Sequence, residues 1–181
     1  MLKALGSKIR LDEENPYAEE YLSYVSDIMD HDIVCRMKDY MQHGRTTTYQ
    51  HCLNVSWYNF VLCKLLSLDA RAGARGGFLH DLFLYDWHIH TPRKGRLMHP
   101  FTHPEDALEN AKQHFELTVK EEDIIAKHMF PIATSFPKYR ETVIITIVDK
   151  YCGFIEAVDG WAANAKDAFI NMRTVLKRKS V

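Results

Sequence analysis

The chain has 181 residues, 46% of them hydrophobic, and a formal net charge of −1. A chain of this length can bury a substantial core, so we expect one domain spanning 1–181. The small net charge excludes a strong positive field for attracting nucleic acid or an anionic membrane surface. None of the four cysteines stands in a CxxC pair, which favours reduced thiols in an intracellular protein.

The N-terminal sequence holds too short an apolar run for a signal peptide. No window contains the ~18 apolar residues that a membrane-spanning helix needs. We therefore expect a soluble cytoplasmic protein whose partners include neither a membrane nor a nucleic-acid polymer. The pattern leaves the oligomeric state open.

Helical periodicity dominates the chain, and no convincing strand alternation interrupts it. The prediction is therefore an all-α fold of roughly seven to nine helices. Residues 1–14 are charged, and we expect them to form a loose arm. Asn15-Pro16 then has the form of a helix start, and apolar residues continue at helical spacing, past a possible break near 31–32, until Gly44.

The next two predicted helices carry the first candidate ligands. A threonine within 46–48 caps a helix that holds His51 in its first turn. A short helix restarting at 68–70 is rich in alanine and glycine and ends in His80-Asp81. Because small side chains let helices approach closely, we expect this short helix to be central.

Residues 84–102 break the helical pattern and combine aromatic, basic and histidine side chains. A loop of this length inside a compact helical domain is uncommon and often functional. We interpret it as a lid over an anionic ligand. The alternative, which the sequence leaves equally open, is a solvated basic turn.

Four further helices are predicted. His103-Pro104 opens one, with proline in the first turn, and Thr118 begins a capping box for another that runs to about His128. After a loop over 131–137, helices are expected over about 138–158 and 162–177.

Asp149 follows an apolar run, 143–148, that should lie in the core. An unpaired carboxylate there costs several kcal/mol, so Asp149 must meet a cation, hydrogen-bond donors or a metal. The metal-free alternative is an ion pair with one of three basic residues, namely Lys150, Lys127 or Arg140. Each candidate histidine also has an ordinary explanation when taken alone, such as a carbonyl-capping role for His128.

The order His51, His80-Asp81, Asp149 resembles the HD superfamily of metal-dependent phosphohydrolases, in which this pattern binds metal on an all-helical core. The resemblance covers roughly residues 40–155 and extends to the flanks of each motif, such as Phe78-Leu79-His80-Asp81-Leu82. It implies that His51, His80, Asp81 and Asp149 hold a metal ion.

His103 and His128 are similar to the two extra histidines of the branch that binds two metals. The resemblance implies that Asp81, His103 and His128 hold a second ion, with Asp81 bridging. Nitrogen and oxygen ligands accept iron, manganese, nickel, cobalt or zinc, so one or two divalent transition-metal ions are expected. Met129 follows His128 where the cyclic-dinucleotide phosphodiesterases would show a histidine pair, which disfavours that substrate.

The implied activity is hydrolysis of a small phosphorylated substrate, such as a nucleotide or related metabolite, by a metal-activated water. Developing charge on phosphoryl oxygens needs cationic partners. The candidate substrate-binding residues are Arg45, Arg93, Lys94 and Arg96. The candidate catalytic residues are Asp81, Arg45, Arg96 and His99, with His88 and His90 as alternative proton donors to the leaving oxygen.

Two other functions use the same ligands. One is a diiron oxygenase, which the same fold also supports. The other is a regulatory module that keeps the metal without turnover. A further interpretation of Lys150 is that it does not bind the metal but contacts the Asp149 carboxylate and orients it.

Overall fold

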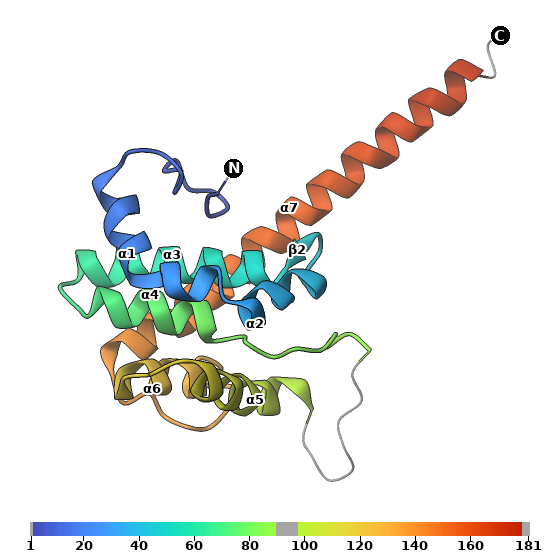
Figure 1. The fold of residues 1–181 in the computed structure, drawn as a ribbon. Helices are drawn as coiled ribbons and strands as arrows, with labels where there is room; N and C mark the ends of the chain where they lie inside the picture. Colours follow the sequence, from blue (N-terminus) through green and yellow to red (C-terminus); the bar gives the residue numbers. More distant parts are fainter. Residues whose placement is uncertain (1, 90–97, 179–181) are drawn as a thin grey trace.

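The computed structural model describes residues 2–89 and 98–178, with side chains described as far as residue 170. Within these ranges the chain forms seven α-helices, a 3-10 helix and a small antiparallel sheet of two strands (Figure 1). The all-α prediction is confirmed. The elements are α1 (Pro16–Met29), α2 (Asp32–Cys35), η1 (Arg36–Asp39), β1 (Met41–His43), β2 (Thr46–Thr47), α3 (Thr48–Leu65), α4 (Ala70–Leu79), α5 (His99–His114), α6 (Val119–Lys127) and α7 (Arg140–Arg178).

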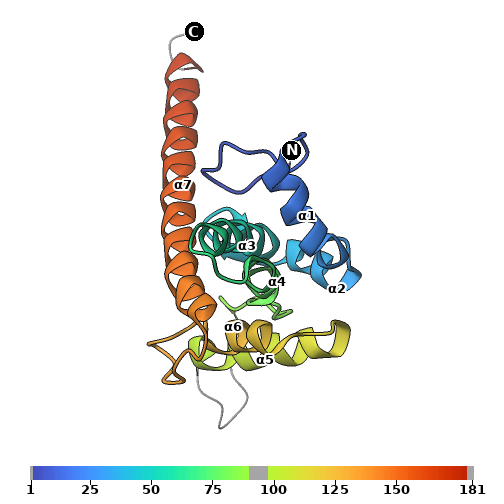
Figure 2. The same cartoon turned by 90° about the vertical axis from the view of Figure 1, so that its left-hand side faces the viewer.

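Helix α4 lies at the centre, between α3 on one side and α5 and α6 on the other (Figure 2), and it also contacts α1 and α7. Glycines make this approach possible. A Cβ on Gly76 would lie 2.7 Å from Ile124 Cγ2, and one on Gly77 would lie 2.9 Å from the Cα of Ser56. The prediction of a central helix rich in small residues is therefore confirmed, with His80 at its C-cap and Asp81 just beyond.

Three predicted helix starts are confirmed by their caps. The Asn15 side chain accepts hydrogen bonds from the backbone at the start of α1. Thr47 caps α3 by accepting from Gln50 N. Thr118 and Glu121 form the capping box of α6. These caps fix where the helices that carry His51 and His128 begin.

The N-terminal arm packs on α3, although we expected it to be loose. Ala4 and Leu11 are buried. The backbone N–H of Leu5 donates to Asn54 Oδ1 at 2.9 Å, and the Tyr58 hydroxyl donates to the Leu5 carbonyl at 2.7 Å. Apolar residues between the charges, together with polar partners on α3, hold this arm in place.

The prediction that helical structure continues as far as Gly44 is wrong at the C-terminal end of this segment. The 3-10 helix η1 ends at Asp39, and β1 and β2 then form a hairpin whose turn contains Gly44 with φ +57°. Strands of three and two residues are too short to produce a recognisable alternation.

Helix α5 begins at His99, before the predicted start at His103. Pro100 occupies the first turn, where proline is tolerated, and Pro104 lies inside the helix. The predicted loop over 84–102 is therefore shorter at its C-terminal end. Its residues 90–97 lie outside the described ranges.

The two helices predicted after residue 138 are one helix, α7, of 39 residues. Gly160 does not break it. A Cβ on Gly160 would lie 3.2 Å from Gly44 Cα, so glycine there allows the hairpin to approach. Beyond this contact α7 extends away from the other helices (Figures 1 and 2).

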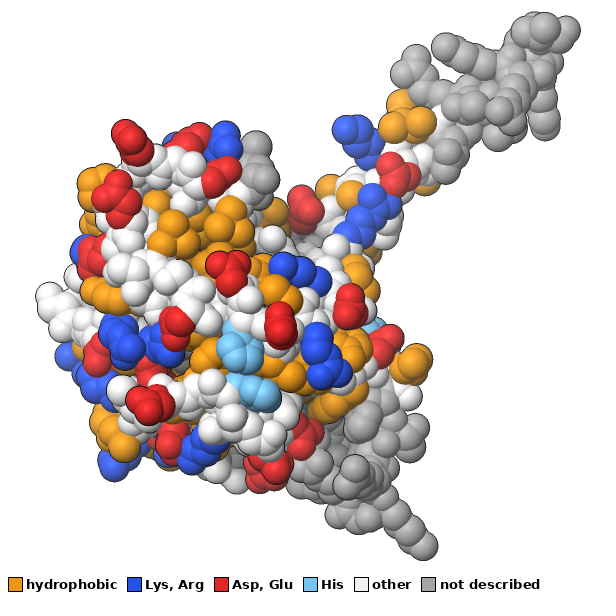
Figure 3. All heavy atoms as spheres, in the orientation of Figure 1, with side chains coloured by type: hydrophobic (Ala, Val, Ile, Leu, Met, Phe, Trp, Pro, Cys, Tyr) orange, Lys and Arg blue, Asp and Glu red, His pale blue; other side chains and the backbone are white. Residues whose placement is uncertain are grey.

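The surface mixes acidic and basic side chains on the face seen in Figure 3, in keeping with the small net charge. No helix in the described part of the chain is long and apolar enough to cross a bilayer.

Candidate metal centre

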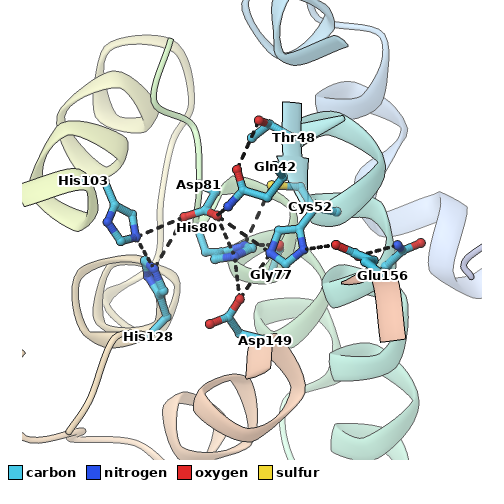
Figure 4. Close-up of polar contacts among 12 residues, drawn as sticks. Gln42, Thr48, Cys52, Gly77, His80, Asp81, His103, His128, Asp149 and Glu156 are labelled. Carbon is cyan, nitrogen blue, oxygen red and sulfur yellow. Dashed lines mark hydrogen bonds and ion pairs between the residues drawn. The ribbon is translucent and has the colours of Figure 1, made fainter. Parts of the chain in front are cut away.

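The six residues predicted as metal ligands come from five helices or their C-terminal ends and meet in one place, and Figure 4 labels five of them. They are His51 in α3, His80 and Asp81 at the end of α4, His103 in α5, His128 at the C-cap of α6, and Asp149 in α7. All except Asp149 are buried. Groups of these histidines and carboxylates lie close enough to hold metal ions.

One half of the centre joins His51, His80 and Asp149. Asp149 Oδ1 lies 3.2 Å from His51 Nε2 and 3.6 Å from His80 Nε2. Asp81 Oδ2 lies 3.8 Å from His51 Nε2 and 3.5 Å from His80 Nε2. Two imidazole nitrogens and two carboxylate oxygens therefore face a common point.

The other half joins the second oxygen of Asp81 to His103 and His128. Asp81 Oδ1 lies 3.3 Å from His103 Nε2 and 3.5 Å from His128 Nε2. The two Nε2 atoms are 2.8 Å apart. Asp81 thus offers one oxygen to each half, which is the arrangement of a bridging carboxylate.

Backbone carbonyls fix the orientation of three of the four rings. Nδ1 of His80 donates to Gly77 O at 2.9 Å, and that of His128 donates to Ile125 O at 2.9 Å. Nδ1 of His103 donates to His99 O at 2.8 Å. A carbonyl only accepts, so Nδ1 carries the hydrogen and the Nε2 lone pair of a neutral ring points into the centre.

Several polar atoms in the centre lack ordinary partners. Among the described residues, His80 Nε2 and Asp81 Oδ1 are buried without a hydrogen-bond partner. With both Nδ1 atoms donating to carbonyls, neutral rings of His103 and His128 would place two lone pairs 2.8 Å apart. A divalent cation removes both problems, so the donor set fits transition-metal ions.

The charges in the centre are strongly coupled. Burial lowers the pKa of His51, but Asp149 and Glu156 outweigh it, so this pKa is raised well above 6.5. The pKa of His80 is also raised, because Asp81 opposes the effect of burial. Burial, with the nearby His80 and His103, lowers the pKa of His128 to about 3.

Both carboxylates hold their charge. Burial alone would raise the pKa of Asp81, yet His80 and His103 lower it below the usual range. Hydrogen bonds from His51 and His80 likewise place the pKa of Asp149 well below 3.8 against the effect of burial. The centre therefore keeps two negative charges with which to attract a cation.

Two residues behind the ligands were missed from the sequence. Glu156 Oε2 lies 2.9 Å from His51 Nδ1, and Glu156 Oε1 accepts from Asn54 Nδ2 at 2.7 Å. Gln42 donates to Asp81 Oδ2 at 2.7 Å. Glu156 follows Asp149 by two helical turns on the same face, and this spacing could have revealed it. Gln42 had no such signal, because a helix was expected where β1 lies.

A cavity of about 330 Å³ adjoins the ligands. Its lining includes His43, Trp87, His99 and Lys150. The ring of His99 stacks on Trp87 with centroids 5.5 Å apart and on His103 with centroids 4.5 Å apart. The predicted proton donor His99 is therefore brought beside a ligand and onto the cavity wall.

Comparison with known proteins finds no matching family model, no matching curated protein and no matching solved structure. The geometry itself supports a helical protein with clustered histidine and aspartate side chains that can bind metal.

Of the four predicted substrate-binding cations, Arg45 lies within the described residues, and it does not line this cavity. Arg45 borders a separate hollow and forms an ion pair with Asp167 and a 3.1 Å hydrogen bond with Asn164 Oδ1. Arg93, Lys94, Arg96 and His90 lie outside the described residues. In the part of the chain that the structure describes, Lys150 is the basic side chain that lines the cavity, aside from histidines.

The structure also describes two of the lysines considered as metal-free partners of Asp149, and the alternative proton donor His88. Lys150 Nζ is 3.9 Å from Asp149 Oδ2, whereas Lys127 pairs with Asp123. The other oxygen of Asp149 faces histidines rather than a lysine or arginine. His88 is exposed and pairs with Asp86 at 3.0 Å.

Proposed function

We propose that this chain is a metal-dependent phosphohydrolase of the HD superfamily. It would cleave a phosphomonoester or phosphodiester of a small nucleotide or related metabolite. The observation that carries the proposal is the position of Asp81, which directs one oxygen to His51 and His80 and the other to His103 and His128. Paired cation sites bridged in this way suit in-line displacement at phosphorus.

His51, His80, Asp81 and Asp149 would hold one ion, and Asp81, His103 and His128 would hold the second. When bound, divalent ions supply an acidified water and stabilise charge on phosphoryl oxygens. Iron, manganese, nickel, cobalt and zinc all suit this set of nitrogen and oxygen donors. Glu156 and the carbonyls behind the rings would keep the Nε2 atoms aimed at the ions.

The cavity walls would receive the substrate. Lys150, half-exposed at the cavity, would donate charge-assisted hydrogen bonds to phosphate oxygens. His99, whose Nδ1 lies 3.2 Å from the Tyr85 hydroxyl, would protonate the leaving oxygen. Trp87 and Met129 would cover the apolar part of the substrate and exclude water.

The loop cations keep their proposed role. Trp87 and His99 stand on either side of residues 90–97 and both line the cavity. Arg93, Lys94 and Arg96 lie outside the described residues, and their role as partners of the phosphate stays a proposal from the sequence. Arg45 is left out of the proposed site, because Asp167 and Asn164 engage its guanidinium elsewhere.

The test pairs metal analysis with activity. Protein loaded separately with manganese, iron, cobalt, nickel or zinc would be assayed on phosphomonoesters, phosphodiesters and nucleotides, beside Asp81→Ala and the exposed control Asp12→Ala. We expect hydrolysis by the wild type and by the control, and none by Asp81→Ala. Full metal occupancy without hydrolysis of any substrate contradicts the proposal, and dioxygen uptake by the iron form would replace it with an oxygenase.

A further inference from the structure

The outward face of α7 carries a regular apolar stripe. Its members follow one another at alternating steps of four and three residues. This outer stripe consists of Ile147, Tyr151, Phe154, Val158, Trp161, Ala165 and Ala168. The large side chains among them are exposed, with Phe154 at 68% and Trp161 at 82%. A mean step of ~3.5 residues is the period of helices that pack along their length as coiled coils.

The opposite face of α7 packs against the body of the protein. At about 100° per residue, Asp149, Glu156 and Gly160 lie roughly 130–170° around the helix from the centre of the stripe. Asp149 and Glu156 contact His51, and Gly160 packs on Gly44 of the hairpin. The body of the protein therefore occupies the inner face, and the stripe points away from it.

The hairpin also fixes the projecting part of the helix. Arg45 binds Asn164 and pairs with Asp167, both beyond the last close backbone contact at Gly160. These polar residues lie on the same side as the body, so they cover none of the stripe. The direction of the stripe is thus set by contacts within one chain.

The stripe lacks the charges of a solvated helix face. Between residues 151 and 165 the sequence has two charged residues, Glu156 and Asp159. Glu156 is buried at the metal centre, and Asp159 borders the hollow beside Arg45. A long helix that extends from the body gains little stability in water without packing of its apolar face. A contiguous exposed apolar face of this kind marks an interaction surface.

We propose that the outer stripe is the interface of a homodimer in which the α7 helices of two copies pack antiparallel. In one antiparallel register Phe154 of one copy lies opposite Ala165 of the other, Val158 lies opposite Trp161, and Tyr151 lies opposite Ala168. Large side chains then meet small ones at two layers. In a parallel pair, Trp161 would face Trp161 of the other copy, and Ala165 would face Ala165. The tryptophan layer would then be overcrowded, and the alanine layer would be underfilled.

The surface has a recess of the right kind for this packing. Val158, Trp161, Ala162 and Ala165 line a hollow of about 430 Å³ on the stripe. In the antiparallel register this hollow receives the partner's large side chains, as a knob enters a hole in a coiled coil. Each projecting half of α7 then covers the body-proximal half of the stripe on the other copy.

The first experiment measures molar mass by light scattering and sedimentation at high micromolar concentration. The wild type is expected at twice the chain mass of 21.1 kDa. Phe154→Glu and Trp161→Glu should each give the monomer. Lys166 is exposed and lies about 100° around the helix from the stripe, so the control variant Lys166→Glu should stay dimeric. Circular dichroism checks that each variant stays helical. A monomeric wild type, or a dimer that persists in both stripe variants, overturns the proposal.

A second experiment tests the orientation by cross-linking. In a Cys35→Ser background, the three remaining native cysteines are buried. A mixture of Phe154→Cys and Ala165→Cys chains should form a disulfide-linked dimer on oxidation, whereas neither chain alone should. Efficient self-linking of Trp161→Cys, without the mixed product, overturns the antiparallel register. A monomer that floats with vesicles of phosphatidylcholine and phosphatidylserine overturns the homodimer and assigns the stripe to a membrane surface.

Discussion

The two halves of the metal centre differ in the negative charge that surrounds them. The half formed by α3, α4 and α7 combines His51 and His80 with the carboxylates of Asp81 and Asp149. A third carboxylate, Glu156, lies directly behind His51. Each carboxylate in this half raises the attraction for a divalent cation and makes the imidazole ligands more basic.

The half formed by α5 and α6 has one shared carboxylate oxygen, from Asp81, and two histidines. Neutral carbonyls lie behind the rings of His103 and His128. With fewer charges, this half should bind its ion more weakly than the other. From this difference in charge we expect one tightly held ion and one that exchanges more readily, with Asp81 between them.

The largest effect is expected from Asp81→Ala, which removes the ligand common to both halves. Bound metal should fall to near zero, and the metal-dependent activity should drop by more than the ~10–100-fold that changes behind the ligands cause. Elemental analysis of the purified variant measures this loss. Retention of one tightly bound ion would show that Asp81 serves one half only.

His128→Ala should separate the two halves. It removes a ligand of the weaker site, so one ion should be lost while the tighter ion remains. His103→Ala should behave in the same way. His51→Ala is the matched comparison and should weaken the tighter ion. Metal titration followed by calorimetry gives both stoichiometry and affinity, and unchanged values for His128→Ala and His103→Ala would leave a mononuclear site.

Glu156→Gln tests the charge behind the tighter half. The change keeps the size of the side chain but removes the carboxylate that faces His51 Nδ1. Affinity for the first ion should fall by ~10–100-fold, with little change at the second. Equal weakening of both ions would mean that Glu156 acts through the fold rather than through His51.

Metal affinity should fall as the pH is lowered. His51 and His80 have pKa values raised above 6.5 in the metal-free fold, so a cation must displace their protons. Each displaced proton weakens binding by ~10-fold per pH unit below the raised pKa.

The thermal stability of the protein should also depend on the protonation of these histidines. The protonated histidines stabilise the metal-free fold below pH 6.5, and this contribution is lost as the pH rises through their raised pKa values. The gain in melting temperature on adding metal should therefore be larger at pH 8 than at pH 6. A gain that is larger at pH 6 would contradict the assignment of these histidines as ligands.

Lys150→Ala should have the smallest effect, about 10-fold on kcat/KM for an anionic substrate, as expected for losing ~1.4 kcal/mol of transition-state binding. Arg96→Ala should act similarly, and Lys94→Ala less strongly. Metal content and thermal stability should hardly change. Steady-state kinetics beside metal analysis checks this, and wild-type kinetics in all three variants would leave the phosphate to the metal ions alone.

Some of the proposed metal ligands stand in short local patterns that drew attention to them in the sequence. His80-Asp81 ends a run of small residues, and Asp149 ends an apolar run. His80 and Asp81 are buried as these patterns indicate, whereas Asp149 is partly exposed. The convergence of His103 and His128 rested on the family resemblance, since the sequence alone does not set the distance between α5 and α6.

The errors have physical causes that act over long distances. Gln42 and the hairpin were missed because their strands are very short, and the turn carries Arg45 toward α7 instead of the cavity. A break was expected between residues 158 and 162, but α7 continues through it, and Gly160 there packs against Gly44. Such roles depend on a partner far away in sequence, which a local pattern does not contain.

The most direct test of the central claim is a crystal structure of the metal-loaded protein with anomalous scattering collected at the absorption edge of the metal. We expect two anomalous peaks ~3.5–4 Å apart. One should lie between Asp81 Oδ2, His51, His80 and Asp149, and the other between Asp81 Oδ1, His103 and His128. A single peak, or peaks that do not contact Asp81, would contradict the bridging role from which the proposed function is argued.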